Sequence, residues 1–312
     1  MSAENKKNFF WALNIAGLTI NIRSELDIAF LNSERFLPFQ TTSKKKEIFI
    51  FFHLIGSKDL TGPPLDPDSE PLLVKAGRRG TDSPLLRSKH VKARLHHARD
   101  HTDLLFVEIF PEALSILDFK SNRADFYYSP GSTPELEKRL IGPAMLAPFL
   151  PKFDACLLHA SAIVRHGRTA VFLAPDEGGK TTAVRLSPSG TILCDDQVLV
   201  RRFPEGCRVS GTPWGLHVNA KVQPPLGGLF LLEKASRFAL APLATRDLVP
   251  PIWGEIKNSL SILPKPLKKK AFAIICEIVA AVPAWRMSFP KKHIDWEKID
   301  QAMNKEVEGL KD

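Results

Sequence analysis

The chain has 312 residues, 44% of them apolar and 25% charged, so it is long enough for one large or two ordinary packed domains. Its four cysteines lie far apart and form no CxxC pair, which argues against a disulfide framework or a zinc ribbon and fits a reducing, cytoplasmic setting. The net charge of +9 suits an anionic partner, but no zinc finger, RNA-recognition signature or basic-zipper pattern occurs, so nucleic acid is not the expected partner.

The N-terminal residues are basic and then apolar, as in a secretion signal. Asn14 interrupts the apolar stretch, and the alternation in NIAGLTINI favours a β-strand over a signal peptide. Because no run of about 18 apolar residues occurs, no membrane span is predicted.

Strands are predicted through most of residues 1–132. EIFIFFHLIG extends the strand signal to residue 55, and DLLFVEIF, ALSILDF and RADFYYS resume it from residue 103. Residues 56–102 are rich in proline, acidic and then basic residues, and we interpret them as an exposed, irregular insertion. Within it, His97 and His101 have the i,i+4 spacing of a helical metal site, but the polar surroundings favour a solvated surface.

A helix start at Ser132–Glu135 indicates a boundary near residue 132 and a second domain over 133–312. Two apolar runs around His166-Gly167-Arg168 predict a hairpin. A short helix is then expected in TTAVRLS, and strands in TILCDDQVLVRRF, CRVSGTPWG and LGGLFLLEK. The last predicted elements are an apolar helix in KKKAFAIICEIVAAV, a strand in AWRMSF and an amphipathic helix from His293.

Residues 174–182, APDEGGKTT, match the end of the phosphate-binding pattern G-x-x-x-x-G-K-[ST] and lie between a predicted strand and a predicted helix. In such a loop, backbone N–H groups bind phosphate oxygens, the lysine reaches the β- and γ-phosphates, and the next hydroxyl binds Mg²⁺. The residues expected to bind nucleotide are therefore Asp176, Glu177, Gly178, Gly179, Lys180, Thr181 and Thr182.

The loop departs from this pattern in two ways, so whether it binds a nucleotide is an open question at this point. Ala174 stands in place of the first glycine, and alanine is tolerated there if its φ stays negative. Asp176 and Glu177 would repel a triphosphate unless their carboxylates point outward or toward Mg²⁺. A glycine-rich turn before a capped helix, without any nucleotide, is the alternative interpretation.

Asp195 and Asp196 follow the predicted strand TILC directly, one helix beyond the loop. Two carboxylates at such a place can hold Mg²⁺ and accept the proton of an attacking hydroxyl. Neighbouring side chains on a strand face opposite sides, so a bend is needed if both are to contribute. An acidic turn without catalytic function is the alternative, and the combination with the loop favours phosphoryl transfer.

His159, the loop ending at Lys180-Thr181 and the pair Asp195-Asp196 together resemble the kinase core of the HPr kinase/phosphorylase family, whose fold is related to ATP-dependent phosphoenolpyruvate carboxykinase. The turn Gly211-Thr212-Pro213-Trp214 is similar to one in divergent members from bacterial gene clusters, some of which phosphorylate serine in peptides, including lasso-peptide precursors. The resemblance covers roughly residues 155–290.

The resemblance implies a mixed α/β fold in which a P-loop-containing nucleotide-binding domain, 133–312, follows a β-rich region, 1–132, that holds the acceptor. It implies ATP and Mg²⁺ as cofactors, with Thr181 and Asp195 at the metal. One aspartate would bind metal and the other accept the substrate proton, while His159 would polarise a phosphate or the substrate. The implied catalytic residues are His159, Lys180, Asp195 and Asp196.

We therefore expect a cytoplasmic ATP- and Mg²⁺-dependent serine kinase that acts on a peptide or small protein. Two alternatives stay open: a non-catalytic nucleotide-binding or scaffold protein that retains the fold, and a small-molecule kinase acting on free serine. CRVSGTPWG does not match the glutamate-bearing signature of the bifunctional enzyme, so neither phosphorylase activity nor HPr as substrate is expected. A homo-oligomer is compatible with the sequence.

Overall fold

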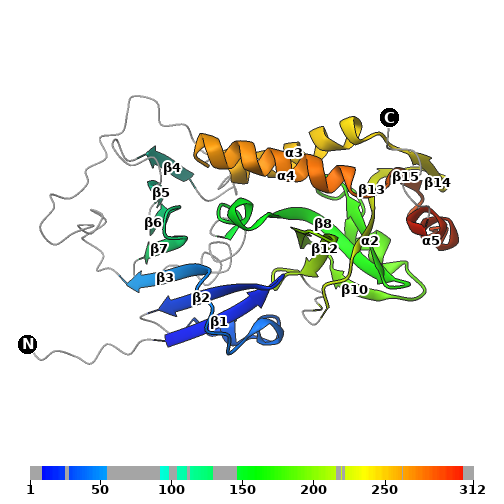
Figure 1. Cartoon of the computed structure of the whole chain (residues 1–312). Helices are drawn as coiled ribbons and strands as arrows, with labels where there is room; N and C mark the ends of the chain where they lie inside the picture. Colours follow the sequence, from blue (N-terminus) through cyan, green and yellow to red (C-terminus); the bar gives the residue numbers. More distant parts are fainter. Residues whose placement is uncertain are drawn as a thin grey trace, which may run out of the picture. The chain divides into compact units, whose positions relative to one another are not determined.

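The computed structural model describes residues 9–24, 28–54, 92–97, 104–110, 113–128, 146–215, 219, 222–261 and 263–304. Over these residues the protein has a mixed α/β fold with two mixed sheets (Figure 1), which confirms the predicted class. The chain divides into two compact units. The first comprises Met1–Phe149 with Asn258–Pro264, and the second Leu150–Lys257 with Lys265–Asp312.

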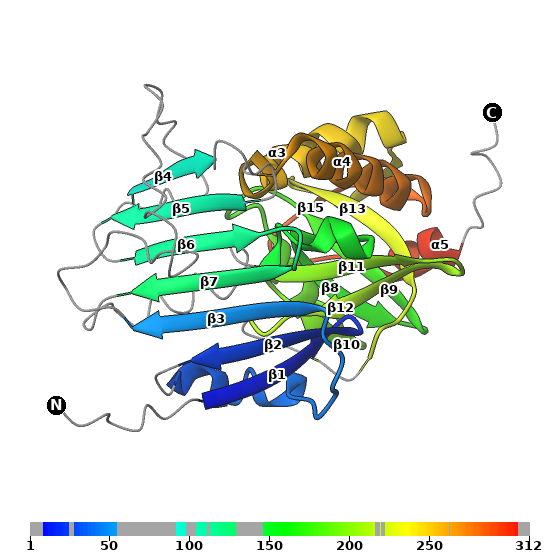
Figure 2. The same cartoon turned by 60° about the vertical axis from the view of Figure 1, so that its left-hand side comes forward.

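The first unit contains a seven-stranded sheet in the order β1-β2-β3-β7-β6-β5-β4 (Figure 2). Its strands are β1 Phe9–Ile15, β2 Leu18–Ser24, β3 Ile48–Leu54, β4 Lys92–His97, β5 Leu104–Phe110, β6 Ala113–Asp118 and β7 Arg123–Tyr128. The short helices η1, Ala29–Asn32, and η2, Leu37–Phe39, join β2 to β3. Alternation along the strands buries one set of apolar side chains, including Ile20, Ile50 and Phe52. The strands predicted around the insertion are therefore confirmed.

β4 corrects one prediction. We expected residues 56–102 to be irregular, but their last described part is an edge strand antiparallel to β5. Edge strands often carry charged residues, as Lys92 and Arg94 do here, and this composition masked the strand signal. Because His97 lies in a strand, the helical spacing to His101 does not apply. His101, most of the insertion and the predicted helix start at Ser132–Glu135 lie outside the described residues.

The second unit contains an eight-stranded sheet in the order β12-β11-β8-β9-β13-β15-β14, with β10 also paired to β8. Its strands are β8 Ala155–Arg165, β9 Arg168–Leu173, β10 Thr191–Cys194, β11 Gln197–Phe203, β12 Gly206–Gly211, β13 Leu226–Lys234, β14 Ala239–Pro242 and β15 Ala284–Phe289. β13 runs parallel to β9 and β15, and the remaining pairs are antiparallel. The β8–β9 hairpin and the other predicted strands are confirmed, whereas β14 was not predicted.

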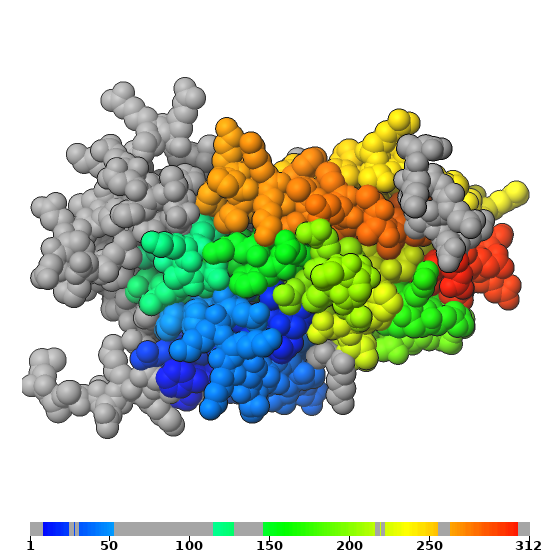
Figure 3. All heavy atoms as spheres, in the orientation of Figure 1, coloured from blue at the N-terminus to red at the C-terminus, as the bar shows by residue number. Residues whose placement is uncertain are grey.

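The described helices after residue 149 are η5 Leu150–Phe153, α2 Lys180–Arg185, α3 Thr245–Ser261, α4 Lys265–Ala280 and α5 Trp296–Asn304, and the last residues of α3 belong to the first unit. α2, α4 and α5 agree with the prediction. α3 was missed because Pro250 and Pro251 lie inside it, and proline normally ends a helix by removing an N–H donor. α4 lies at the surface (Figure 3, orange), with Lys265 and Lys269 exposed. Among the described helices, none is long and apolar enough to cross a membrane.

One face of the second sheet is covered by α2 and α5. The core between them combines strand residues such as Phe172 and Phe230 with Val184 of α2 and Trp296 and Ile299 of α5. The rings of Phe172 and Trp296 meet edge to face, with centroids 5.9 Å apart. Burying each large apolar side chain contributes about 1.5–3 kcal/mol, so this core fixes the strands and the helix that carry the site described below.

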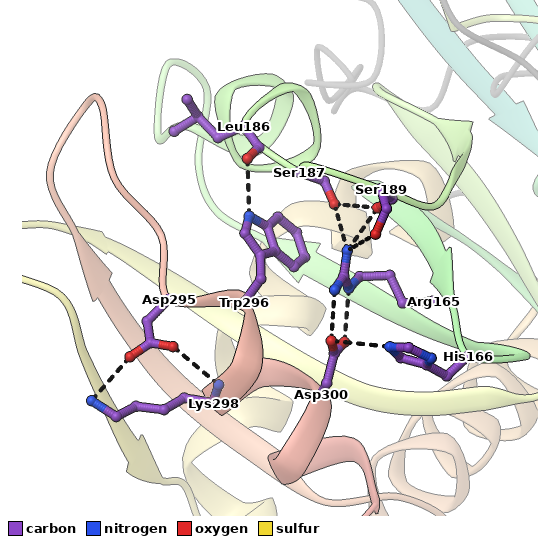
Figure 4. A network of polar contacts seen from close by, with 9 residues as sticks. All are labelled: Arg165, His166, Leu186, Ser187, Ser189, Asp295, Trp296, Lys298 and Asp300. Carbon is purple, nitrogen blue, oxygen red and sulfur yellow. Dashed lines mark hydrogen bonds and ion pairs between the residues drawn. The ribbon is translucent and has the colours of Figure 1, made fainter.

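A polar network joins α5 to the end of β8 (Figure 4). Arg165, only 7% exposed, donates from Nε and Nη2 to the two carboxylate oxygens of Asp300 at 2.7 and 2.6 Å. Its Nη1 donates to Ser187 Oγ and to the carbonyl and hydroxyl oxygens of Ser189. The guanidinium also stacks on Trp296, 4.9 Å from the ring centroid. These contacts tie α5 to the segment after α2.

We expect Asp300→Asn to lower the free energy of unfolding by about 2 kcal/mol, because a charge-assisted pair to a buried guanidinium is lost while the serine contacts remain. Urea denaturation would measure the change. Glu297→Gln on the exposed side of α5 removes the same charge and should cost less than about 0.5 kcal/mol. Equal stability of the two variants would contradict the prediction.

Candidate active site

A pocket of about 380 Å³ in the second unit gathers every site residue expected from the sequence. It is lined by His159, Asp176, Glu177, Gly178, Gly179, Lys180, Thr181, Thr182, Asp195, Asp196 and Trp214. His159 lies on β8, the residues from 176 to 182 on the β9–α2 loop and the start of α2, and the two aspartates between β10 and β11. These segments meet because β8 pairs with β9, β10 and β11.

The loop backbone explains its glycines. Gly179 has φ +101°, a left-handed conformation that side chains with a Cβ adopt at a cost. A Cβ on Gly178 would lie 2.4 Å from the methyl group of Ala174 and 2.8 Å from the carbonyl oxygen of Pro175. Ala174 is not among the residues with positive φ, as its tolerance requires. Because Gly178 has no Cβ, the methyl group of Ala174 has room at the position where the phosphate-loop pattern has its first glycine.

Lys180 spans the loop from the first turn of α2. Its Nζ donates to the carbonyl oxygens of Ala174 at 2.8 Å and Pro175 at 3.1 Å, and lies 4.0 Å from the carboxylate of Asp176. The side chain is 7% exposed. On the β8 side, Ser161 Oγ donates to the Lys180 carbonyl oxygen at 2.7 Å and anchors the start of α2. The ammonium is thus held at the floor of the pocket beside the loop.

Asp195 and Asp196 lie in a bend between β10 and β11, and both line the pocket. The bend that joint participation requires is therefore present. Asp195 is 3% exposed; its backbone oxygen accepts from Thr181 Oγ1 at 3.3 Å, and its carboxylate lies 4.0 Å from Arg185. Asp196 is half-exposed and contacts His159. The two carboxylates thus occupy different environments.

One nitrogen of the His159 ring, Nε2, faces two carboxylates. This nitrogen is 3.2 Å from Asp196 Oδ1 and 3.5 Å from Asp176 Oδ1. The hydrogen bond to Asp196 is the largest influence and raises the pKa of His159, while burial and the charge of Lys180 oppose the rise. The imidazole therefore favours its protonated form more than a free histidine does.

We expect NMR titration of His159 to show an inflection above the ordinary histidine pKa of about 6.5. Asp196→Asn should lower this pKa, and Asp176→Asn should lower it less because its charge is the smallest contribution. Because the pKa of His159 is raised in the folded state, protonated His159 contributes to the free energy of unfolding. This contribution is complete below the ordinary histidine pKa and is lost as pH rises through the raised pKa. An unchanged pKa in Asp196→Asn would refute the assignment.

The oxygen donors suit Mg²⁺ better than a transition metal. Among the described residues, no three His, Cys, Asp or Glu side chains cluster to hold a metal ion. Mg²⁺ needs no such cluster, because it keeps several waters and binds one or two protein oxygens together with substrate phosphates. The Thr181 hydroxyl and the Asp195 carboxylate, on adjoining segments of one pocket, fit this pattern.

Two neighbours of the site were missed as site residues. Trp214 lines the pocket, although the sequence drew attention to it only as part of a turn. Its indole Nε1 is buried without a hydrogen-bond partner among the described residues. Arg185 lies near the Asp195 carboxylate. Its i,i+4 spacing from Thr181 on α2 was a usable signal, since such residues share a helix face.

Comparison with known proteins identifies no family: no family model matches the chain, and no curated protein is significantly similar to it. What the site can do follows from its own residues. Backbone N–H groups, an ammonium and a hydroxyl can bind phosphate and Mg²⁺. The carboxylates can hold a metal and remove a proton from a hydroxyl, and the imidazole adds a second positive charge when it is protonated.

Proposed function

We propose that this protein is an ATP- and Mg²⁺-dependent kinase that transfers a phosphoryl group to a serine hydroxyl of a peptide or small protein. One observation carries the proposal. The phosphate-loop lysine, the following threonine, two aspartates and a histidine, from three separate segments, line one pocket. If the loop were only a structural glycine turn, there would be no reason for the two aspartates and the histidine to lie next to it.

The loop and the start of α2 would bind the substrate phosphates. Backbone N–H groups at 179–181 and the Lys180 ammonium would supply positive potential, whereas the Gly178 N–H donates to the Pro175 carbonyl oxygen at 3.0 Å. Gly178 and Gly179 would let the backbone approach the phosphates. Thr181 and Asp195 would hold Mg²⁺, which when bound neutralises charge on the phosphates. Positioning and charge neutralisation provide most of the catalysis in such reactions.

Asp196 is the better placed of the two aspartates to accept the proton of the acceptor hydroxyl. It is half-exposed, whereas Asp195 is buried next to Thr181. His159 Nε2 lies 3.2 Å from the Asp196 carboxylate, and the raised pKa of His159 favours a positive charge beside the reacting groups. This arrangement would orient the base and offset charge that develops on the transferred group.

Incubation of the purified protein with Mg²⁺ and γ-labelled ATP tests the proposal. A library of serine-containing peptides, a cell extract and free serine would serve as acceptors, with products identified by mass spectrometry. The proposal expects a phosphoserine product on a peptide or protein. A protein that binds no Mg·ATP and phosphorylates none of these acceptors would overturn it, and a product on free serine alone would favour a small-molecule kinase.

Asp176 motivates a second candidate, a nucleotide-binding protein without transfer activity. Its carboxylate lies 4.0 Å from the Lys180 ammonium and 3.5 Å from His159, so it competes with phosphate for the ammonium and for the imidazole in its protonated form. The side chain is 90% exposed, however, and can turn toward solvent when an anion binds. Its charge therefore weakens nucleotide binding without blocking the pocket.

We expect Asp176→Asn to tighten Mg·ATP binding about 5-fold, because a unit charge about 4 Å away in a water-like environment is worth about 1 kcal/mol. Calorimetric titration would measure the affinity, and high salt should reduce the gain. Glu177→Gln, which removes an equal charge from the neighbouring exposed position, is the matched comparison. Weaker binding by Asp176→Asn would show instead that Asp176 assists the metal.

A further inference from the structure

A second pocket, of about 350 Å³, adjoins the candidate active site through His159, which lines both. Its walls come from β8, β9 and β13 and from α3. Leu158, Leu173, Leu231 and Ile252 contribute apolar surface, and Gly254 of α3 also lies among the described lining residues. The role proposed above for the loop and the aspartates does not use this pocket.

The lining defines what kind of group the pocket takes. Among the described residues that form it, His159 is the one that titrates, and the others are aliphatic, proline or glycine. A charged group would lose its hydration there without gaining a partner, apart from the histidine. An uncharged, apolar group of the size of a leucine or phenylalanine side chain fits both this chemistry and the volume.

The position of the pocket indicates which substrate supplies this group. Ala174 and Pro175 also line it, and their carbonyl oxygens accept hydrogen bonds from Lys180. In a phosphate loop this lysine contacts the β- and γ-phosphates, while the ribose and the base lie beyond the α-phosphate, at the opposite end of the phosphate chain. The pocket therefore adjoins the terminal phosphate, where the acceptor approaches, and not the nucleobase.

We propose that this pocket binds an apolar side chain of the acceptor peptide, within a few residues of the phosphorylated serine. The inference rests on the proposed kinase function and narrows its substrate class to serines with a neighbouring large apolar residue. His159 would then face the acceptor on one side and the phosphates on the other. Specificity would come from burial of this side chain next to the reacting centre.

Gly254→Leu provides the test variant. A Cβ at Gly254 would have no atom within 4 Å, so a leucine there has room and fills the pocket. Leucine is also a better helix former than glycine inside α3, so the variant should fold at least as well as the parent. Gly254→Ala is the matched control, because it gives the same gain in helix propensity and leaves most of the pocket open.

The measurements use synthetic serine peptides that carry Leu, Phe, Ala, Asp or Lys at each position within three residues of the serine. For the parent protein, kcat/KM should be about 10- to 100-fold higher with Leu or Phe than with Asp or Lys at one position. Gly254→Leu should remove this preference, whereas Gly254→Ala should retain it. Mg·ATP affinity should be similar in all three proteins, because none of the changes replaces Lys180, Thr181 or Asp195, the residues proposed to bind the phosphates and the metal.

Different results separate failure of this inference from failure of the kinase proposal. Phosphorylation without preference for an apolar neighbour, or a preference that persists in Gly254→Leu, would overturn the inference and leave the kinase function standing. Mg·ATP binding with transfer only to free serine would also overturn it. Absence of both nucleotide binding and transfer would overturn the kinase function and the inference with it.

Discussion

Lys180→Met is expected to lower the rate of phosphoryl transfer about 100- to 1,000-fold, as loss of one preorganised donor at a charged transition state typically does. The Lys180 ammonium lies at the pocket floor with two backbone carbonyls and one carboxylate near it. Under the proposed function, the Lys180 ammonium would supply a positive charge at the β- and γ-phosphates of the bound nucleotide. Methionine keeps the length and apolar contacts of the side chain but removes the charge and the donors.

Single-turnover rates with labelled ATP would measure this loss, and calorimetry would report the accompanying fall in Mg·ATP affinity. Lys234→Met is the control, because it makes the same change at an exposed lysine on β13. Thermal unfolding should verify that Lys180→Met remains folded. Transfer at the parent rate in a folded Lys180→Met protein would show that the loop does not bind the reacting phosphates.

Asp196→Asn is expected to lower kcat about 1,000-fold while Mg·ATP affinity changes little, since a general base typically contributes a factor of about 100 to 10,000. Asparagine cannot accept the proton, although it preserves the shape of the side chain. Asp196→Asn also removes the carboxylate that does most to raise the pKa of His159, so the remaining activity should depend differently on pH. Steady-state kinetics between pH 5 and pH 9, about the range in which histidine titrates, would test both points.

Asp195→Asn is the informative comparison for Asp196→Asn. Asp195 is buried, and its backbone oxygen accepts a hydrogen bond from the Thr181 hydroxyl. Its replacement should therefore raise the Mg²⁺ concentration needed for half-maximal activity, an effect that Asp196→Asn should not show. The opposite result would be a higher Mg²⁺ requirement in Asp196→Asn and a lower kcat alone in Asp195→Asn. It would show that Asp196 binds the metal and that Asp195 accepts the proton.

The elements with strong local patterns could be predicted from the sequence. β-Branched and aromatic alternation gave β1, β2, β3 and the strands of the β8–β9 hairpin, and the apolar period gave α4 and α5. Local patterns failed where they were weak or contradictory. β4 carries basic residues and histidines, and α3 contains Pro250 and Pro251.

The candidate site could be assembled from the sequence because its residues have fixed local roles. A strand, a Gly-Gly-Lys-Thr loop and a helix need only short-range geometry, which the order of the residues from Ala174 to Arg185 already contains. The aspartate pair could be expected at the end of a strand for the same reason. The chemical types of the residues were thus readable without knowledge of long-range contacts.

Long-range packing settled the remaining features, because they depend on residues that are distant in the chain. The pairing of β8 with β9, β10 and β11 brings His159 to Asp196 and Asp176. The different burial of Asp195 and Asp196, and the apolar pocket that α3 lines together with three strands, likewise depend on segments dozens of residues apart. Residue types set the possible chemistry of this protein, and the pairing of its strands determines which of those residues lie together.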